Sequence, residues 1–161
     1  MKKYEINPAN LIAELFAAIE SEKWDRVKRR LADDFQFSGV VPYPLGKIDF
    51  ILFQRALRLG IPELRFNLHD VKYKGNVINA KVKLVGVHNH DFVVPFSGLP
   101  SVPASGKLVS LPVAEVKFIV RDGKIAKFEV KTFPGGGIEG ILQQLDANKL
   151  LVYADEEMID Y

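Results

Sequence analysis

The sequence predicts an α+β fold, with helices in the first third of the chain and an antiparallel sheet in the rest. In the first third, apolar residues recur at intervals of three and four, which is the period of a helix that buries one face. Farther on, apolar and charged residues alternate over three long segments, as they do in strands that bury one side. Because helical and strand patterns do not alternate along the chain, they do not favour a βαβ fold.

Three helices are predicted. Asn7 is a suitable N-cap, and Pro8 suits the first helical position because the N–H that proline lacks has no helical partner there. A second, short helix covers residues 24–31, and a third runs from about residue 48 to 59, where Gly60 ends it. The buried stripe of the first helix is expected to consist of Leu11, Ile12, Leu15, Phe16 and Ile19.

The long strands are predicted over residues 78–84, 114–120 and 127–131, and each has an apolar face and a charged face. Strands of this kind belong to an antiparallel sheet with helices on one side and water or a partner on the other. The turn at residues 121–124 leaves two registers open. One pairs Lys117 with Glu129 and so opposes unlike charges; the other, with a three-residue loop, shifts that pairing by two.

The composition is that of one globular domain. The 161 residues are 48% apolar and 26% charged, and a net charge of +2 is too balanced for a protein that mainly grips nucleic acid. Cysteine is absent, which excludes disulfides and thiolate chemistry. No apolar run reaches the roughly 18 residues of a membrane-spanning helix, and no secretory signal pattern is present. We therefore expect a cytoplasmic protein that binds neither nucleic acid nor membrane.

Acidic residues gather at the C-terminus. From Ile138 to Tyr161 there are six acidic residues and one lysine, a pattern typical of a solvated tail. We therefore expect two parts, a folded domain over residues 1–146 and an acidic tail over residues 147–161.

Several short motifs occur in a characteristic order. The sequence resembles the SnoaL-like polyketide cyclase branch of the nuclear-transport-factor-2-like superfamily over residues 8–146. The motifs that carry the resemblance are Leu31-Ala32-Asp33-Asp34-Phe35-Gln36-Phe37, Gly86-Val87-His88-Asn89-His90-Asp91-Phe92, Pro103-Ala104-Ser105-Gly106-Lys107, Arg121-Asp122-Gly123-Lys124-Ile125 and Leu142-Gln143-Gln144-Leu145.

This resemblance implies a cone-shaped half-barrel, in which a strongly curved antiparallel sheet wraps around the N-terminal helices and encloses an apolar cavity. It also implies a homodimer, and a cavity that uses acid/base groups without metal or organic cofactor. The sequence departs from the family at Thr132, where the cyclases carry an acid/base aspartate, and at residues 134–137, which look inserted.

Two residues are candidates for chemistry. Every second residue from 78 to 86 is expected to point to the buried side of the strand, and His88 continues this alternation. Its imidazole is therefore expected to face the apolar interior and to act as a general base. The alternative is a core histidine held by a backbone carbonyl or water. Tyr43 lies in a proline-bounded loop where its hydroxyl could orient a ligand carbonyl, although packing alone also explains it. The expected ligand-pocket wall is Phe66, Leu84, Phe118, Phe128 and Thr132.

Metal and nucleotide sites are not favoured. His88 and His90 can share a strand face, but the parity places His69 on the outer face and turns Asp91 away. Residues 135–140 satisfy the G-x-G-x-x-G spacing, yet too little chain follows for a dinucleotide-binding unit. We therefore expect no metal and no cofactor.

Two functions remain open at this stage. In the first, the cavity binds a small apolar or aromatic molecule, with or without isomerase-, dehydratase- or cyclase-type chemistry. In the second, the protein is a non-enzymatic dimerisation or interaction module that uses the outer sheet face and the acidic tail.

Overall fold

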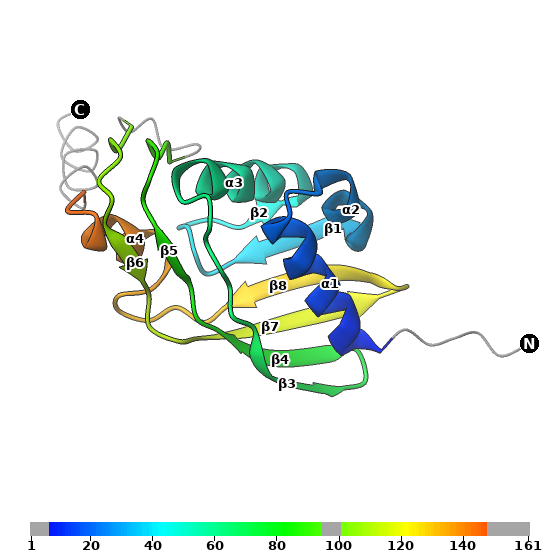
Figure 1. The fold of residues 1–161 in the computed structure, drawn as a ribbon. Coiled ribbons are helices and arrows are strands. Elements are labelled where there is room, and N and C mark those ends of the chain that lie inside the picture. Colours follow the sequence, from blue (N-terminus) through cyan, green and yellow to red (C-terminus); the bar gives the residue numbers. More distant parts are fainter. Residues whose placement is uncertain (1–6, 95–100, 148–161) are drawn as a thin grey trace, which may run out of the picture.

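The computed structural model describes residues 7–94 and 101–147, which form four helices and eight strands (Figure 1). The helices are α1 (Pro8–Glu20), α2 (Trp24–Arg30), α3 (Lys47–Gly60) and α4 (Gly137–Gln144). The strands are β1 (Leu31–Ser38), β2 (Leu45–Gly46), β3 (His69–Lys74), β4 (Val77–Val82), β5 (Val85–Val87), β6 (Leu108–Ser110), β7 (Ala114–Arg121) and β8 (Lys124–Val130). The α+β class is therefore confirmed.

The helices begin and bury their faces as their local patterns indicate. The Asn7 side chain accepts a hydrogen bond from the N–H of Ala9 at 2.9 Å, and Pro8 is the first residue of α1. The whole predicted stripe of α1 is buried. Helix α2 ends at Arg30, so Leu31 begins strand β1 instead of closing the helix.

The main sheet is mixed, so the expectation of an antiparallel sheet is corrected. Its strand order is β2-β1-β8-β7-β4-β3, and β1 runs parallel to β8, with Leu31 opposite Ile125 and Phe37 opposite Phe128. The alternation of apolar and polar residues is the same in both directions of pairing. Only a hairpin fixes the direction from sequence, and β1 and β8 are not joined by one.

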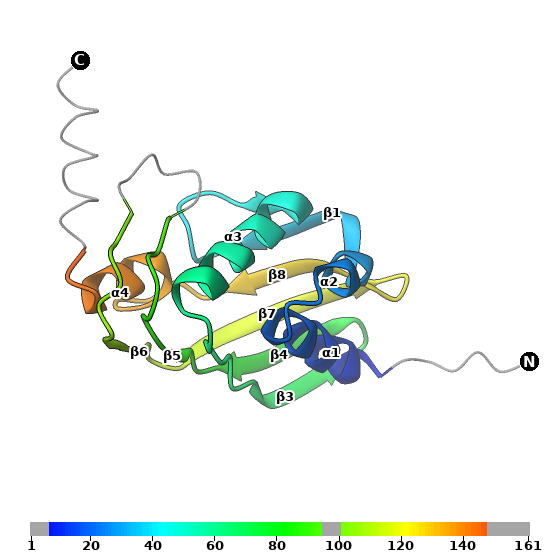
Figure 2. The same ribbon diagram turned by 45° about the horizontal axis from the view of Figure 1, so that its top comes forward.

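The sheet is also neither closed nor strongly curled, and the predicted cone-shaped half-barrel is wrong in this respect (Figure 2). After Val82 the chain leaves the main sheet, and β5 pairs with β6 in a separate two-stranded sheet. The chain also leaves the main sheet before β7, where Pro112 lies in the segment that connects β6 to β7. Proline has no N–H for a ladder hydrogen bond, so the pairing is interrupted at this point. We call residues 85–94 and 101–111 the arm.

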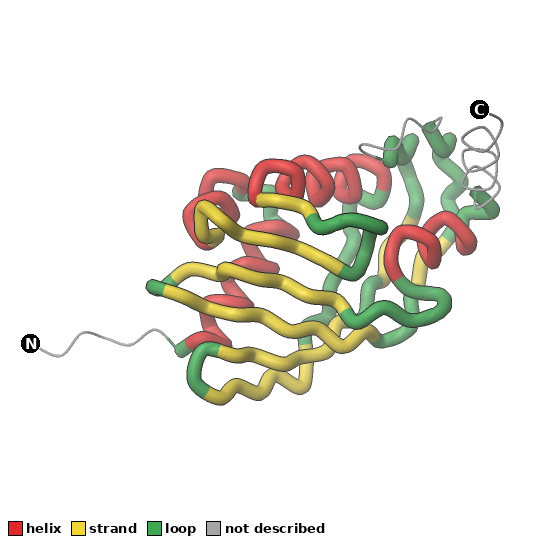
Figure 3. Tube along the Cα trace, turned by 180° about the vertical axis from the view of Figure 1, so that it is seen from behind, coloured by secondary structure: helices red, strands yellow, loops and turns green. Residues whose placement is uncertain are grey.

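The two faces of the main sheet differ. Helices α1, α2 and α3 cover one face, and no helix of the described chain lies on the other (Figure 3). On the uncovered face Lys117 is opposite Glu129, and Lys131 Nζ lies 3.2 Å from Glu115 Oε2. The hairpin turn has positive φ at Asp122 and Gly123 and pairs Arg121 with Lys124. A bulge between Ile119 and Val120 then shifts the register by one residue, which places Lys117 opposite Glu129.

Phenylalanines dominate the core between the helices and the sheet. The ring centroids of Phe118 and Phe128 are 4.4 Å apart, those of Phe16 and Phe66 4.7 Å, and those of Phe37 and Phe128 4.8 Å. Such contacts add to the stabilisation that burial already provides. The core therefore joins α1 to strands from both halves of the sheet.

Two further expectations concern the acidic tail and a membrane-spanning helix. Apart from Ala147, the predicted tail over residues 147–161 lies outside the described residues. Within residues 7–94 and 101–147, no helix is long and apolar enough to cross a membrane.

Candidate functional site

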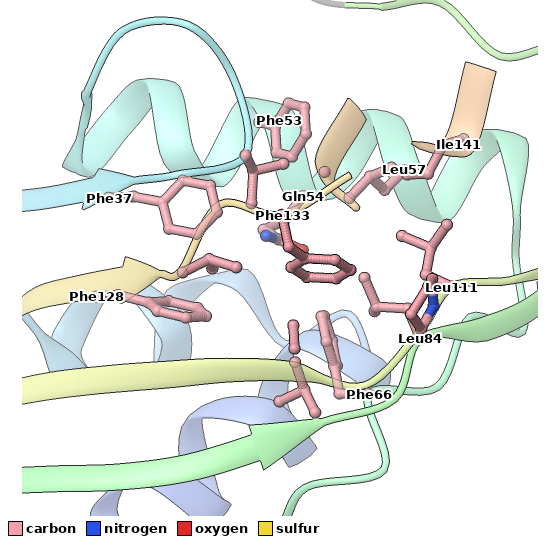
Figure 4. A pocket seen from close by; sticks show the side chains of 16 residues that line it. Phe37, Phe53, Gln54, Leu57, Phe66, Leu84, Leu111, Phe128, Phe133 and Ile141 are labelled. Atoms are coloured by element: carbon pink, nitrogen blue, oxygen red, sulfur yellow. The ribbon is translucent and has the colours of Figure 1, made fainter. Parts of the chain in front are cut away.

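An apolar pocket lies where the main sheet ends and the arm begins, between α3, α4 and the inner sheet face (Figure 4). Its free volume is about 50 Å³. The lining residues come from helices α3 and α4, from strands β1, β4, β7 and β8, and from connecting segments. The lining residues are Phe37, Val40, Phe53, Gln54, Leu57, Phe66, Val82, Leu84, Leu111, Pro112, Ala114, Phe128, Val130, Phe133, Gly137 and Ile141.

Helix α3 contributes the polar group of the pocket. Phe50, Gln54 and Leu57 follow the helical period of three and four, so they lie on the buried face of α3. Gln54 is only 3% exposed, and its Oε1 has no hydrogen-bond partner among the described residues. It is the one polar side chain of the sixteen lining residues, and its amide points into the space beside Phe133 (Figure 4).

The segment between β8 and α4 fills much of the pocket. The half-buried ring of Phe133 lies within the space that the other walls enclose (Figure 4). Gly136 permits this position, because a Cβ there would lie 2.6 Å from Cζ of Phe133. Gly135 and Gly137 have positive φ values of 82° and 63°, which L side chains rarely adopt. The segment that the sequence showed as an insertion therefore folds back over the pocket.

The five residues predicted to form the pocket wall lie in three different places. Phe66, Leu84 and Phe128 line the pocket. Phe118 is completely buried in the aromatic core but is not a lining residue. Thr132 is exposed and borders a groove on the opposite face of the sheet, together with Lys117 and Lys131.

His88 is buried, as its parity predicts, but in the arm rather than at the pocket. Its exposed fraction is 0%, its Nδ1 lies 2.8 Å from Ser105 Oγ, and its Nε2 has no hydrogen-bond partner in the described part of the chain. Burial lowers the pKa of the His88 imidazole, while the nearby Val102 backbone and the Asp91 charge partly oppose this effect. His88 is not a lining residue of the pocket.

Tyr43 and the remaining histidines lie elsewhere. Tyr43 is 44% exposed and does not line the pocket either. His69 and His90 are exposed, and Asp91 accepts a hydrogen bond from the N–H of Ala104 at 2.9 Å. Over residues 7–94 and 101–147, no three histidine or carboxylate side chains are grouped so that they could hold a metal ion. The structure therefore does not bring the two predicted catalytic residues together with the pocket.

A family model described as a SnoaL-like domain matches residues 12–128, which is most of the chain. The protein belongs to the SnoaL-like family. This match confirms the resemblance expected from the motifs. It ends before Phe133 and α4, so those two walls of the pocket lie outside the part that the family model describes.

Solved structures show the same fold. IdmH from Streptomyces antibioticus, a proposed polyketide cyclase, superposes with a TM-score of 0.68 at 18% identity, covering 88% of this SnoaL-like chain and 99% of IdmH. TsrD from Streptomyces laurentii gives 0.66 at 19% identity, with 89% and 99% covered. An LEH-like epoxide hydrolase from M. tuberculosis gives 0.62 at 16%, with 90% and 95% covered. A comparison with curated proteins finds no match.

Sequence reasoning missed Gln54, Phe133 and α4 as parts of the site. A signal for Gln54 was present, because a glutamine four residues after Phe50 and three before Leu57 interrupts an apolar helical stripe. Phe133 had no comparable signal, since an aromatic residue before a glycine-rich segment does not reveal where its ring lies.

Proposed function

We propose that this SnoaL-like protein binds a small, mainly apolar molecule in the pocket between α3, α4 and the main sheet. The observation that carries the proposal is the lining itself, in which one amide stands among apolar walls. Ligand pockets in proteins are commonly built in this way, with few polar groups that fix orientation. A proposed polyketide cyclase and an LEH-like epoxide hydrolase share this fold, which supports a role in binding a small molecule.

The pocket must open for such a ligand to enter. Its free volume of about 50 Å³ is well below the roughly 150 Å³ of a cavity that holds benzene. Movement of the Phe133 ring adds the space of one aromatic ring to this free volume, because that ring lies inside the pocket. The binding-competent form is therefore one in which the ligand takes the place of Phe133.

The proposal concerns binding rather than catalysis. None of the sixteen lining residues carries an acid or a base, and an amide does not ionise near neutral pH. Isomerase-, dehydratase- or cyclase-type chemistry that uses His88 or Tyr43 stays a prediction. So does the homodimer, for which the uncovered sheet face with its alternating lysine and glutamate side chains offers a surface.

A solvatochromic probe tests the proposal. Neutral 6-propionyl-2-dimethylaminonaphthalene is expected to show blue-shifted, saturable emission with the protein. Phe133→Ala should tighten binding by about tenfold or more, because it removes the cost of displacing a half-buried ring. Leu84→Trp should weaken binding by filling the pocket, whereas Leu52→Trp, at an exposed position of α3, should not.

Circular dichroism of each variant is the control for folding. Emission that does not saturate, or equal affinity in the Phe133→Ala, Leu84→Trp and Leu52→Trp variants, would show that the pocket is not the binding site.

A further inference from the structure

Of the three buried polar side chains in the described chain, Arg58 and His88 each make a side-chain hydrogen bond through another atom, whereas Gln54 makes none. Its side chain is almost completely buried, and Oε1 has no partner among the described residues. A buried acceptor without a hydrogen bond costs about 1–3 kcal/mol in folding. Native structures rarely keep such a group without a reason. A leucine would fit the apolar stripe of α3 without that cost, so stability alone does not account for Gln54.

A second glutamine shows how this chain satisfies an amide that is structural. Gln144 in α4 accepts a hydrogen bond from the Ser110 N–H and donates one to the Ser110 carbonyl, both at 2.7 Å. This reciprocal pair ties α4 to β6. Gln54 has the same chemistry, but its Oε1 faces no donor from the pocket walls.

Water does not fit the position well either. A buried water typically needs two to four polar partners. The pocket lining offers only the Gln54 amide, because the other fifteen lining side chains are apolar or absent. The partner that suits this acceptor is therefore a single donor carried by an otherwise apolar molecule.

We propose that Gln54 is the specificity-determining residue of the pocket, and that it accepts a hydrogen bond from one hydroxyl group of an apolar, ring-sized ligand. This inference rests on the proposed function, since it concerns the same pocket. The ring of the ligand replaces the Phe133 ring, beside which the amide lies (Figure 4). The hydroxyl then satisfies Oε1, so binding relieves a cost that the free protein carries.

Two ligands of matched shape test the assignment on the full chain. 2-Naphthol and 2-methylnaphthalene differ in one hydroxyl in place of one methyl group. By calorimetric titration, the wild-type protein should bind 2-naphthol about tenfold more tightly, the value expected for one added hydrogen bond. Gln54→Leu should abolish this preference and retain affinity for 2-methylnaphthalene. Leu57→Met, an apolar change in the same wall, should keep the preference.

A second measurement does not depend on any variant. In the wild-type protein, saturating 2-naphthol should shift the side-chain amide NMR resonances of Gln54 more than 2-methylnaphthalene does. The amide resonances of Gln144 should be unaffected by either compound, because both polar atoms of that side chain are already paired with Ser110.

The outcomes separate the two proposals. Equal affinity of the wild-type protein for both compounds, or a preference that survives in Gln54→Leu, would overturn the role of Gln54 while leaving the pocket as a ligand site. Binding of neither compound would overturn both the role of Gln54 and the proposed function.

Discussion

Gln54 in the pocket and His88 in the arm are both polar side chains with almost no exposed surface, yet their surroundings differ. His88 belongs to the arm segment 85–94 and contacts the arm segment 101–111. Its N–H donates to the Lys107 carbonyl at 2.9 Å, its carbonyl accepts from the Gly106 N–H at 2.8 Å, and its ring contacts Ser105. Gln54 lies instead among side chains from several elements, and none of them gives Oε1 a hydrogen bond.

Burial of a polar residue therefore does not by itself identify a ligand site. His88 joins two segments of chain, which is a structural arrangement even though one ring nitrogen has no partner. Gln54 Oε1 has no partner within the described part of the chain, and its side chain lines a pocket. The distinction predicts opposite responses to substitution, because removing a paired group leaves its partner unsatisfied and removing an unpaired group does not.

The largest effect is expected in the arm. His88→Ala should lower the free energy of unfolding by about 3 kcal/mol, since it leaves a cavity and removes the partner of Ser105. Chemical denaturation measures this loss. His90→Ala, at the exposed neighbour two residues on, should change stability by only about 0.5 kcal/mol or less. A loss below about 1 kcal/mol for His88→Ala would contradict the structural interpretation of the arm.

The two glutamines give the next effect. Gln144→Leu should lower the free energy of unfolding by about 2 kcal/mol, because the N–H and carbonyl of Ser110 lose their partners. Gln54→Leu should leave stability unchanged or raise it by about 1 kcal/mol, because it removes an unpaired buried acceptor. The same denaturation experiment compares them. Equal losses in the two variants would mean that Gln54 is also held by the fold.

A smaller effect is expected from pH. Burial lowers the pKa of the His88 imidazole in the folded state below its ordinary value of 6.5. The unfolded chain then binds the proton more readily, so stability is full above pH 6.5 and falls as the pH drops from there toward the folded-state pKa. Thermal unfolding between pH 7.5 and 5 should show this fall. Because His88→Gln removes the titrating ring, it should reduce the slope; an unchanged slope would assign the effect to other groups.

Local elements of the fold follow from the sequence. The Asn7–Pro8 start of α1, its buried stripe and the turn at Asp122–Gly123 depend on neighbouring residues alone. The parity that ran from Ile78 to His88 also predicted correctly that the histidine is buried. It could not show which buried space the ring enters, because alternation gives the side of a strand and not its surroundings.

For the candidate site, sequence predicted part of the wall and not its polar group. Phe66, Leu84 and Phe128 line the pocket as expected. Gln54 interrupts the apolar stripe of α3 in the sequence, but only the structure shows that its Oε1 has no partner among the described residues. The clearest sequence candidate for chemistry, His88, was conspicuous because of its residue type rather than its position.

Patterns in the sequence were enough to predict the first three helices, the three long strands and their buried sides, and the family to which the chain belongs. These properties depend on periodicity and on short motifs, which are local. The tertiary structure alone decided that β1 pairs parallel to β8, that the sheet divides at the arm, and that Phe133 lies beside Gln54. Those results depend on contacts between segments far apart in the chain, where packing rather than local preference selects the partner.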